Sequence, residues 1–368
     1  MHEVSLPKPI RYGKIIKQNN TLTMKLFDRR SLRFAAAMFA ATTVALASCD
    51  SAIYDDEGDC SVRYQVGFRY KKNVLDVDAF ASQVKSVSLF VFDRNGTLVA
   101  TKTESGEALA REGYSMQVDV APGRYDLVAW CGLTESEAFS LVGGARPARK
   151  EDLACRLARE TPDGAAAARC DKPLDALFHG YAENVEFPDT YGDHVAGVVD
   201  LTKNTNTVRV ILQHYNGREL DKDDFSFTVT DDNGLMNYDN TLLDDEIIVY
   251  GECKKQSGEV SLPDGSRTVT SISSVIAQID LARLVKQGHA PELTVACKDK
   301  SEPLFRLPLI DLLLCAKGDV PYAKEDQDYL DRQDNYNLIF FIDDENGWYA
   351  KGGIWINSWH VMRQSSDL

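Results

Sequence analysis

Apolar and polar residues alternate along several stretches of this 368-residue chain, and that alternation limits the folds available to it. In "SVRYQVGFRY", residues 61–70, an extended strand would carry on one face Val62, Tyr64, Val66, Phe68 and Tyr70. A period of two is that of a β-strand with one buried face, because successive side chains point to opposite sides. The stretch therefore predicts a half-buried strand.

Turn residues separate the predicted strands in the first half. "VKSVSLFVFD" runs into Asp93-Arg94-Asn95-Gly96, and Asn-Gly is a strong hairpin signal. Ala121-Pro122-Gly123 separates "YSMQVDV" from "RYDLVAW" and predicts a second hairpin. Between residues 134 and 178, helix-forming patches alternate with Gly and Pro, so we expect an insertion of short helices and loop.

Strand patterns continue to the C-terminus, from "ALFHGYAENVEF" and "GVVDL" through "NTVRVILQHY" and its successors. "LIDLLLCAKG" is the best helix candidate of the second half, and "DNYNLIFFID" with "DENGWYAKGGIWINSW" predicts a closing hairpin. The chain is therefore expected to be all-β. We predict two tandem antiparallel β-sandwiches, residues 60–202 and 203–368, with the short helical insertion in the first.

A short apolar run near the N-terminus indicates export. Four basic residues precede fourteen uncharged residues, 34–47, which are too few to span a bilayer as a permanent helix. Leu46-Ala47-Ser48-Cys49 resembles the lipobox of bacterial lipoproteins, whose cysteine receives diacylglycerol and becomes the new N-terminus. We interpret residues 1–48 as an extension plus a signal peptide, with Met24 as the expected start because a basic region normally opens such a signal. The alternative is a simple signal peptide with a chance cysteine.

The charge balance disfavours nucleic acid as a partner. The chain has 41 basic and 56 acidic side chains and a net charge of −15, and removing residues 1–48 leaves 33 and 54. Such an acidic surface repels nucleic acid and anionic lipid head groups. Outside the signal no apolar stretch is long enough to span a membrane, so attachment would depend on the lipid.

An acidic stretch follows the lipobox cysteine. "DSAIYDDEGD" places four carboxylates within ten residues of the expected lipid: Asp55, Asp56, Glu57 and Asp59. A charged segment of this kind buries little apolar area, so residues 49–59 are expected to be a tether. The stretch also resembles the acidic signal that sends Bacteroidetes lipoproteins to the cell surface. A solvated linker is the simpler interpretation.

Seven cysteines remain once the lipobox cysteine is assigned, and no two form a CxxC pair. Cys155 with Cys170 is the most plausible local disulfide, although connectivity cannot be deduced from sequence. Cys131, Cys297 and Cys315 lie in apolar surroundings and are expected to be buried thiols.

No catalytic motif was found in the sequence. GxSxG, HExxH, Walker and GxGxxG patterns are missing. In "DDNGLMNYDNTLLDDE", Gly234 follows Asp231 by three residues, whereas the calcium loop of an EF-hand needs glycine at its sixth position. This stretch and "DDENGW" are better interpreted as turns. We therefore expect a non-enzyme without metal or cofactor.

Tryptophans crowd the closing hairpin. Trp355 and Trp359 share a parity opposite to that of Ile354 and Ile356, and one of the two faces must be core. Exposed aromatic side chains often carry interface energy. Trp355 and Trp359 are therefore candidates for a partner interface, and core packing of both rings is the competing interpretation.

Taken together, these features resemble the fimbrial anchor lipoproteins of Bacteroidales, the anchor and regulator family of the minor fimbria, a type V pilus. The resemblance is carried, in order, by Cys49 in "LASC", by Cys60 opening "CSVRYQVGFRY", and by "VSLFVFDRNGTLV", "APGRYDLVAWCG", "YLDRQDNYNLIFFIDDENGWY" and "IWINSW". It implies transthyretin-like β-sandwich domains and no catalysis. It also implies a palmitate-bearing outer-membrane protein, exposed on the cell surface, that anchors a fimbria and limits its length.

The partner that this resemblance implies is a fimbrial shaft subunit, joined by β-strand addition at an open sheet edge. A second hypothesis is a surface glycan-binding lipoprotein of a polysaccharide-uptake system, which would share the lipobox, the acidic tether and exposed tryptophans. An enzyme is a third and more distant hypothesis, since a sandwich hydrolase needs paired carboxylates that sequence alone does not reveal.

Overall fold

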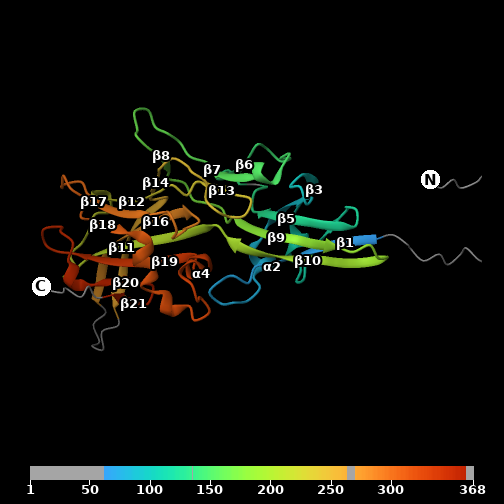
Figure 1. Cartoon of the computed structure of the whole chain (residues 1–368). Coiled ribbons are helices and arrows are strands. Elements are labelled where there is room, and N and C mark those ends of the chain that lie inside the picture. The colour runs from blue at the N-terminus through green and yellow to red at the C-terminus, as the bar shows by residue number, and fades with distance from the viewer. Residues whose placement is uncertain (1–61, 135, 263–269, 362–368) are drawn as a thin grey trace, which may run out of the picture. The chain divides into compact units, whose positions relative to one another are not determined.

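The computed structural model describes residues 62–134, 136–262 and 270–361, and strands make up most of them (Figure 1). The elements of the first half are β1 (Val62–Arg69), α2 (Phe80–Gln83), β2 (Ser86–Phe92), β3 (Leu98–Ser105), η1 (Glu107–Ala110), β4 (Ser115–Val118), β5 (Gly123–Cys131), β6 (Phe139–Val142), η2 (Lys150–Asp152), β7 (Ala154–Leu157), β8 (Ala168–Cys170), β9 (Phe178–Phe187) and β10 (Gly192–Lys203).

The elements of the second half are β11 (Thr205–His214), η3 (Lys222–Asp224), β12 (Phe225–Asp231), β13 (Leu235–Asn237), β14 (Ile248–Gly251), β15 (Lys254–Leu262), β16 (Thr270–Ala282), β17 (Glu292–Cys297), β18 (Phe305–Pro308), α3 (Leu309–Leu314), η4 (Lys317–Asp319), α4 (Asp326–Arg332), β19 (Asn335–Ile342), η5 (Ala350–Gly352), β20 (Ile354–Ile356) and β21 (Trp359–Val361). The prediction of an all-β chain is confirmed.

The first hydrophobic core is enclosed by a seven-stranded sheet in the order β3-β2-β5-β9-β10-β1-β4. β10 joins its two layers, because it pairs with β1 as far as Asp200 and with β9 from Leu201 to Lys203. The alternation predicted for β1 is confirmed, since Tyr64 and Val66 are almost fully buried in this core. Each sequestered side chain of this size contributes roughly 1.5–3 kcal/mol to folding.

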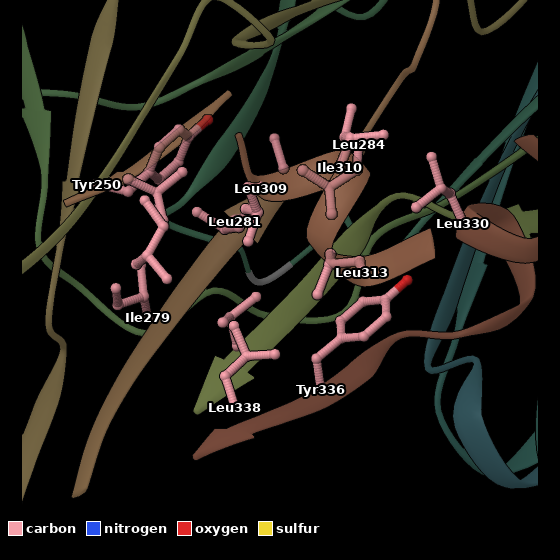
Figure 2. Close-up of a cluster of buried hydrophobic side chains, with 14 of the residues drawn as sticks. Tyr250, Ile279, Leu281, Leu284, Leu309, Ile310, Leu313, Leu330, Tyr336 and Leu338 are labelled. Atoms are coloured by element: carbon pink, nitrogen blue, oxygen red, sulfur yellow. The ribbon is translucent and has the colours of Figure 1, made fainter. Parts of the chain in front are cut away.

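The second core lies between a six-stranded sheet, β15-β16-β11-β19-β20-β21, and a five-stranded sheet, β18-β17-β12-β14-β8. The helix expected at "LIDLLLCAKG" is present as α3. Its apolar residues follow helical spacing, and Figure 2 shows Leu313 directed toward Tyr336 of β19 and Leu309 on the side of Leu281 of β16. α3 therefore closes one end of this core.

The sheets are not purely antiparallel. β1 pairs with β10, β11 with β19, and β14 with β8 in parallel. Parallel neighbours need a long connection, and β1 and β10 are separated by more than one hundred residues. Reasoning from short turns finds only antiparallel neighbours, which is why the prediction missed these pairs.

The insertion between residues 134 and 178 differs from the expected short helices and loop. Its described residues contain one 3-10 turn, η2, and three short strands. β7 pairs with β13, and β8 pairs with β14, so partners distant in sequence complete these strands. Strands of three or four residues are too short to show a period, and this explains the wrong prediction.

The hairpin predicted at Ala121–Gly123 is also wrong. β4 pairs with β1, whereas β5 pairs with β2 and β9, so the turn carries the chain between the two layers. The hairpin at Asp93–Gly96 is confirmed by the pairing of β2 with β3. The domain boundary predicted between residues 202 and 203 falls at the C-terminal end of β10, before its last residue, and it stays a prediction.

The local disulfide suggested for Cys155 and Cys170 is absent, since both are free and buried thiols. Cys131 and Cys297 are buried as expected, but Cys315 is exposed. Burial raises the pKa of the Cys155 thiol to about 12, so this thiol is neutral near pH 7.

Candidate functional site

The closing hairpin lies at an edge of the six-stranded sheet. β20 pairs with β19, and β21, the last strand of the sheet, pairs with β20. Asn357 stands between β20 and β21 with a φ of 53°. Its backbone N–H donates to the Asn337 carbonyl oxygen at 2.8 Å, and its Oδ1 accepts from the Asn337 N–H at 2.9 Å. These two bonds fix the turn and with it the place of β21.

Trp355 is exposed on this hairpin. Its side chain is 38% exposed, and its ring stacks on His360 with the centroids 4.5 Å apart and an interplanar angle of 27°. His360 Nε2 lies 3.2 Å from the Gly352 carbonyl oxygen. Trp355 and His360, with the strands β20 and β21 that carry them, are called the Trp355 edge below. This edge presents a flat aromatic surface next to the last strand of a sheet.

The Trp355 edge rests on a packed layer. Ile356, the residue after Trp355, is fully buried in the second core. Beside it, Phe340 of β19 contacts Phe305 with ring centroids 4.6 Å apart, and Phe305 lies 5.2 Å from Trp348. The alternation of Trp355 and Ile356 therefore places an exposed aromatic ring and a buried aliphatic side chain on opposite faces of a single strand.

Trp359 does not occupy the position that its parity suggested. The register pairs Trp359 with the buried Ile356, and it pairs Trp355 with the exposed His360. A two-residue turn separates the strands, so counting parity straight through the turn fails. The side chain of Trp359 lies outside the described part of the structure.

The opposite edge of the same sheet is β15, which pairs with β16 over nine positions. Its first residues are Lys254 and Lys255. Lys255 Nζ donates to the Phe225 carbonyl oxygen and to Glu252 Oε1, each at 2.9 Å. β15 therefore begins with two cationic side chains, one of which is bound to neighbouring elements.

A polar groove of about 1160 Å³ is lined by residues from both halves of the chain, among them Lys72, Arg283 and Lys286. Arg283 binds the buried Asp331 with both arms of its guanidinium, at 2.8 and 2.9 Å, and Lys72 Nζ binds the same carboxylate at 2.7 Å. Burial alone would raise the pKa of Asp331, but the two cations outweigh it and lower that pKa. Two cations of the groove are thus already paired.

Two histidines also line this groove, His179 and His289. Burial lowers the pKa of His179 to about 4, so its ring is neutral near pH 7, and its Nε2 lies 2.7 Å from the Tyr238 carbonyl oxygen. Sequence reasoning did not find the groove. Its residues come from β9, β10, α4 and the segments after β1, β13 and β16, and no spacing along the chain brings them together.

Several predicted site residues lie outside the described residues. These are the lipidation candidate and the acidic tether, namely Cys49, Asp55, Asp56, Glu57 and Asp59. The signal peptide of residues 1–48 lies there too. Among the helices of the described residues, none is long and apolar enough to cross a membrane.

Comparison with known proteins identifies relatives along most of the chain. A family model described as "Fimbrillin-A associated anchor proteins Mfa1 and Mfa2" matches residues 56–365. The minor fimbrium anchoring subunit Mfa2 of Porphyromonas gingivalis is 21% identical over 359 residues, which are 94% of this chain and 99% of that protein. The match therefore extends beyond both ends of the described residues.

Solved structures share the fold. A protein of Bacteroides thetaiotaomicron, proposed to be an adhesin, is 30% identical with a TM-score of 0.72, over 83% of this chain and 99% of that one. A second protein of that organism, proposed to bind polysaccharide, is 27% identical with a TM-score of 0.69, over 84% of this chain and 100% of that one. Both comparisons extend over nearly the full length of the solved chains.

Proposed function

We propose that this chain, which belongs to the family of Fimbrillin-A associated anchor proteins Mfa1 and Mfa2, anchors a fimbria at the bacterial outer membrane without catalysing a reaction. The observation that carries the proposal is the family match over residues 56–365. A curated relative of similar length is named as an anchoring subunit of a minor fimbrium. We further propose that the chain limits fimbrial length.

The anchor itself would be a lipid on Cys49. The basic stretch, the uncharged run 34–47 and "LASC" support this assignment. Labelled palmitate should enter the wild-type chain and be lost in Cys49→Ala. Cys315→Ala is a suitable control, because Cys315 is exposed and free but has no lipobox before it. Equal labelling of Cys49→Ala and wild type would refute lipidation at Cys49.

The acidic tether would direct the protein to the cell surface. Asp55, Asp56, Glu57 and Asp59 follow the proposed lipid closely. Replacing all four with alanine should leave the chain membrane-bound but hidden from protease added to intact cells. If protease reaches this variant as readily as wild type, the acidic cluster acts only as a linker.

The shaft subunit would join by adding a strand at the Trp355 edge. A sheet edge offers unpaired N–H and C=O groups to a strand from another chain, and an exposed aromatic ring adds apolar contact area. The Trp355 edge meets both conditions, because β21 is the last strand of the sheet and Trp355 on the neighbouring strand is exposed. Trp359 stays a second candidate through its position in β21.

The experiment is to count fimbriae retained on cells and to measure their length. Trp355→Ala should release fimbriae into the medium and change their length, while the folded chain stays at normal abundance. Tyr191→Ala is a matched control, because Tyr191 is 77% exposed and directly precedes β10, a strand of the seven-stranded sheet. Normal retention in Trp355→Ala would place the docking surface elsewhere.

Glycan binding is the second candidate function. It is favoured by the exposed Trp355 ring and by the solved relative proposed to bind polysaccharide. A glycan array probed with the purified chain separates the two functions. Specific binding to one polysaccharide, lost in Trp355→Ala, would favour glycan recognition over fimbrial anchoring.

A further inference from the structure

Three potential metal ligands come together at one end of the second sandwich. Asp231 is the last residue of β12, and Asp232 follows it. His289 comes from the connection between β16 and β17. One donor atom from each side chain lies within 4.8 Å of the other two. The cluster therefore links two segments that are more than fifty residues apart.

Buried hydrogen bonds hold these two segments beside each other. Asn233 Nδ2 donates to the carbonyl oxygens of Ala282 and Arg283, at 3.3 and 3.0 Å. The Tyr250 hydroxyl donates to Asn233 Oδ1 at 2.5 Å, and Tyr250 is fully buried. The fold thus places the end of β12 against the start of the His289 connection, whether or not a ligand binds.

One carboxylate oxygen of the cluster lacks a partner. Asp231 is 5% exposed, and its Oδ1 accepts from the Asp232 N–H at 3.0 Å. Its Oδ2 is buried and has no hydrogen-bond donor among the described residues. A buried carboxylate oxygen without a donor costs free energy and needs an explanation.

Pairing within the cluster does not supply that explanation. His289 Nδ1 lies 2.5 Å from Asp232 Oδ1, so these two groups can form an ion pair or a hydrogen bond. That contact leaves Asp231 Oδ2 unpartnered. A cation between the three side chains would bind a carboxylate oxygen of Asp231 as well as the other two groups.

We propose that Asp231, Asp232 and His289 bind a divalent transition-metal cation of the zinc type. Two carboxylate oxygens and one imidazole nitrogen are a donor set that suits zinc, with a fourth position left for water. The side chain of Asp232 is 43% exposed, and His289 lines the polar groove, so an ion can enter. The bound ion would tie the β16–β17 connection to the end of β12, a role separate from fimbrial attachment.

Zinc titration of the purified, EDTA-stripped chain tests this proposal. The background variant is Cys315→Ser, because an exposed thiol also binds zinc. Calorimetry should find one zinc ion per chain, and the thermal midpoint should rise by a few degrees at saturation because the ion binds only the folded state. Asp232→Asn and His289→Gln should each weaken binding at least about 10-fold.

Asp344→Asn is the matched control. Asp344 Oδ1 lies 3.6 Å from His214 Nε2, which is another Asp–His pair, but it is not part of a three-ligand cluster. This variant should keep full zinc affinity. The thermal midpoints of all variants in EDTA show whether they fold. Absence of zinc binding in wild type, or equal affinity in wild type, Asp232→Asn and His289→Gln, would overturn the proposal.

Discussion

The two edges of the six-stranded sheet are built in opposite ways. β15 has nine residues, pairs with β16 over nine positions and begins with Lys254 and Lys255. β21 has three residues, pairs with β20 over three positions and is next to the exposed Trp355. By hydrogen-bonding length, β15 is the better template for an added strand. Edge lysines are a common protection against such pairing. The difference therefore indicates that β15 is protected against the addition of a strand and that the short Trp355 edge is available for it.

The comparison can be tested first in the core beneath each edge. Ile279 on β16 and Ile356 on β20 are both fully buried, and each lies one strand from an edge. Ile279→Ala should lower the free energy of unfolding by about 2–5 kcal/mol, because it leaves a cavity in a strand paired on both sides. Ile356→Ala should cost at least about 1 kcal/mol less, since β20 pairs with β19 at only two positions and can open locally.

Urea denaturation measures the free energy of unfolding of both variants. Val195→Ala is the control, and it should change that free energy little because Val195 is 66% exposed. Equal costs for Ile279→Ala and Ile356→Ala would mean that β20 and β21 unfold only with the whole sandwich. The Trp355 edge would then be as rigid as the β15 edge, and the proposed contrast between them would be lost.

A glycine near each edge gives the next test. Gly353 has a φ of 69°, and a Cβ there would meet His360 Nε2, whereas a Cβ at Gly258 on β15 would lie 2.9 Å from Ile276 Cδ1 and 3.2 Å from Ser274 Oγ. Gly353→Ala should cost about 1–3 kcal/mol, because a φ of 69° with a ψ of −172° is a backbone conformation that is essentially restricted to glycine, and it should push His360 away from Trp355. Gly258→Ala should be close to neutral, because the far end of an isoleucine side chain can move.

Thermal unfolding measures the difference in stability cost between Gly353→Ala and Gly258→Ala. Gly217→Ala is the control variant. Gly217 has a φ of 80° with open space around it, so Gly217→Ala should show the backbone cost alone. If Gly353→Ala is as harmless as Gly258→Ala, the turn before β20 is not held in the way that the hydrogen bonds of this edge suggest.

The same contrast shows what sequence could predict. β1 and β11 were found because their apolar residues alternate, and their alternate side chains are indeed buried. β15 was missed, because "KKQSGEVSL" is a polar edge strand whose pairing with β16 comes from the neighbour rather than from its own pattern. Local patterns therefore predicted the strands that bury side chains better than the strands that only complete a sheet.

Long-range pairing limited the prediction of the candidate sites. Trp355 was identified as an interface candidate because tryptophans crowd the closing hairpin. Its stacking partner His360, in contrast, follows only from the register of β20 and β21 across the turn. The Asp231–Asp232–His289 cluster depends on two connections that only the folded sandwich brings together. Sequence reasoning treated that aspartate pair as part of a turn, whereas Asp231 ends β12 and Asp232 lies in the bend after it, and it had no signal for the histidine.

The stacking of Trp355 on His360 should make a small, measurable contribution to the edge. Trp355→Ala, His360→Ala and the double variant form a cycle, and aromatic pairs of this geometry couple by about 0.5–1.5 kcal/mol. Thermal or urea unfolding of the four proteins gives the coupling. A value of zero would mean that the two rings contribute independently, and the Trp355 edge would lose the rigidity that a preformed docking surface needs.

The smallest effect on stability is expected for a substitution in the β15 edge, yet this substitution tests the comparison of the two edges most directly. Lys254 is exposed at the start of β15, so Lys254→Val should change the free energy of unfolding by less than about 0.5 kcal/mol. Removing the charge from a long edge strand should instead promote pairing between molecules, because β15 would keep its unpaired backbone groups and gain a β-branched side chain. Light scattering should then detect concentration-dependent association.

Lys300→Val, in the exposed turn after β17, is the control and should stay monomeric like wild type. If Lys254→Val also stays monomeric, the lysine does not guard β15, and that edge becomes an equal candidate for docking the fimbrial subunit.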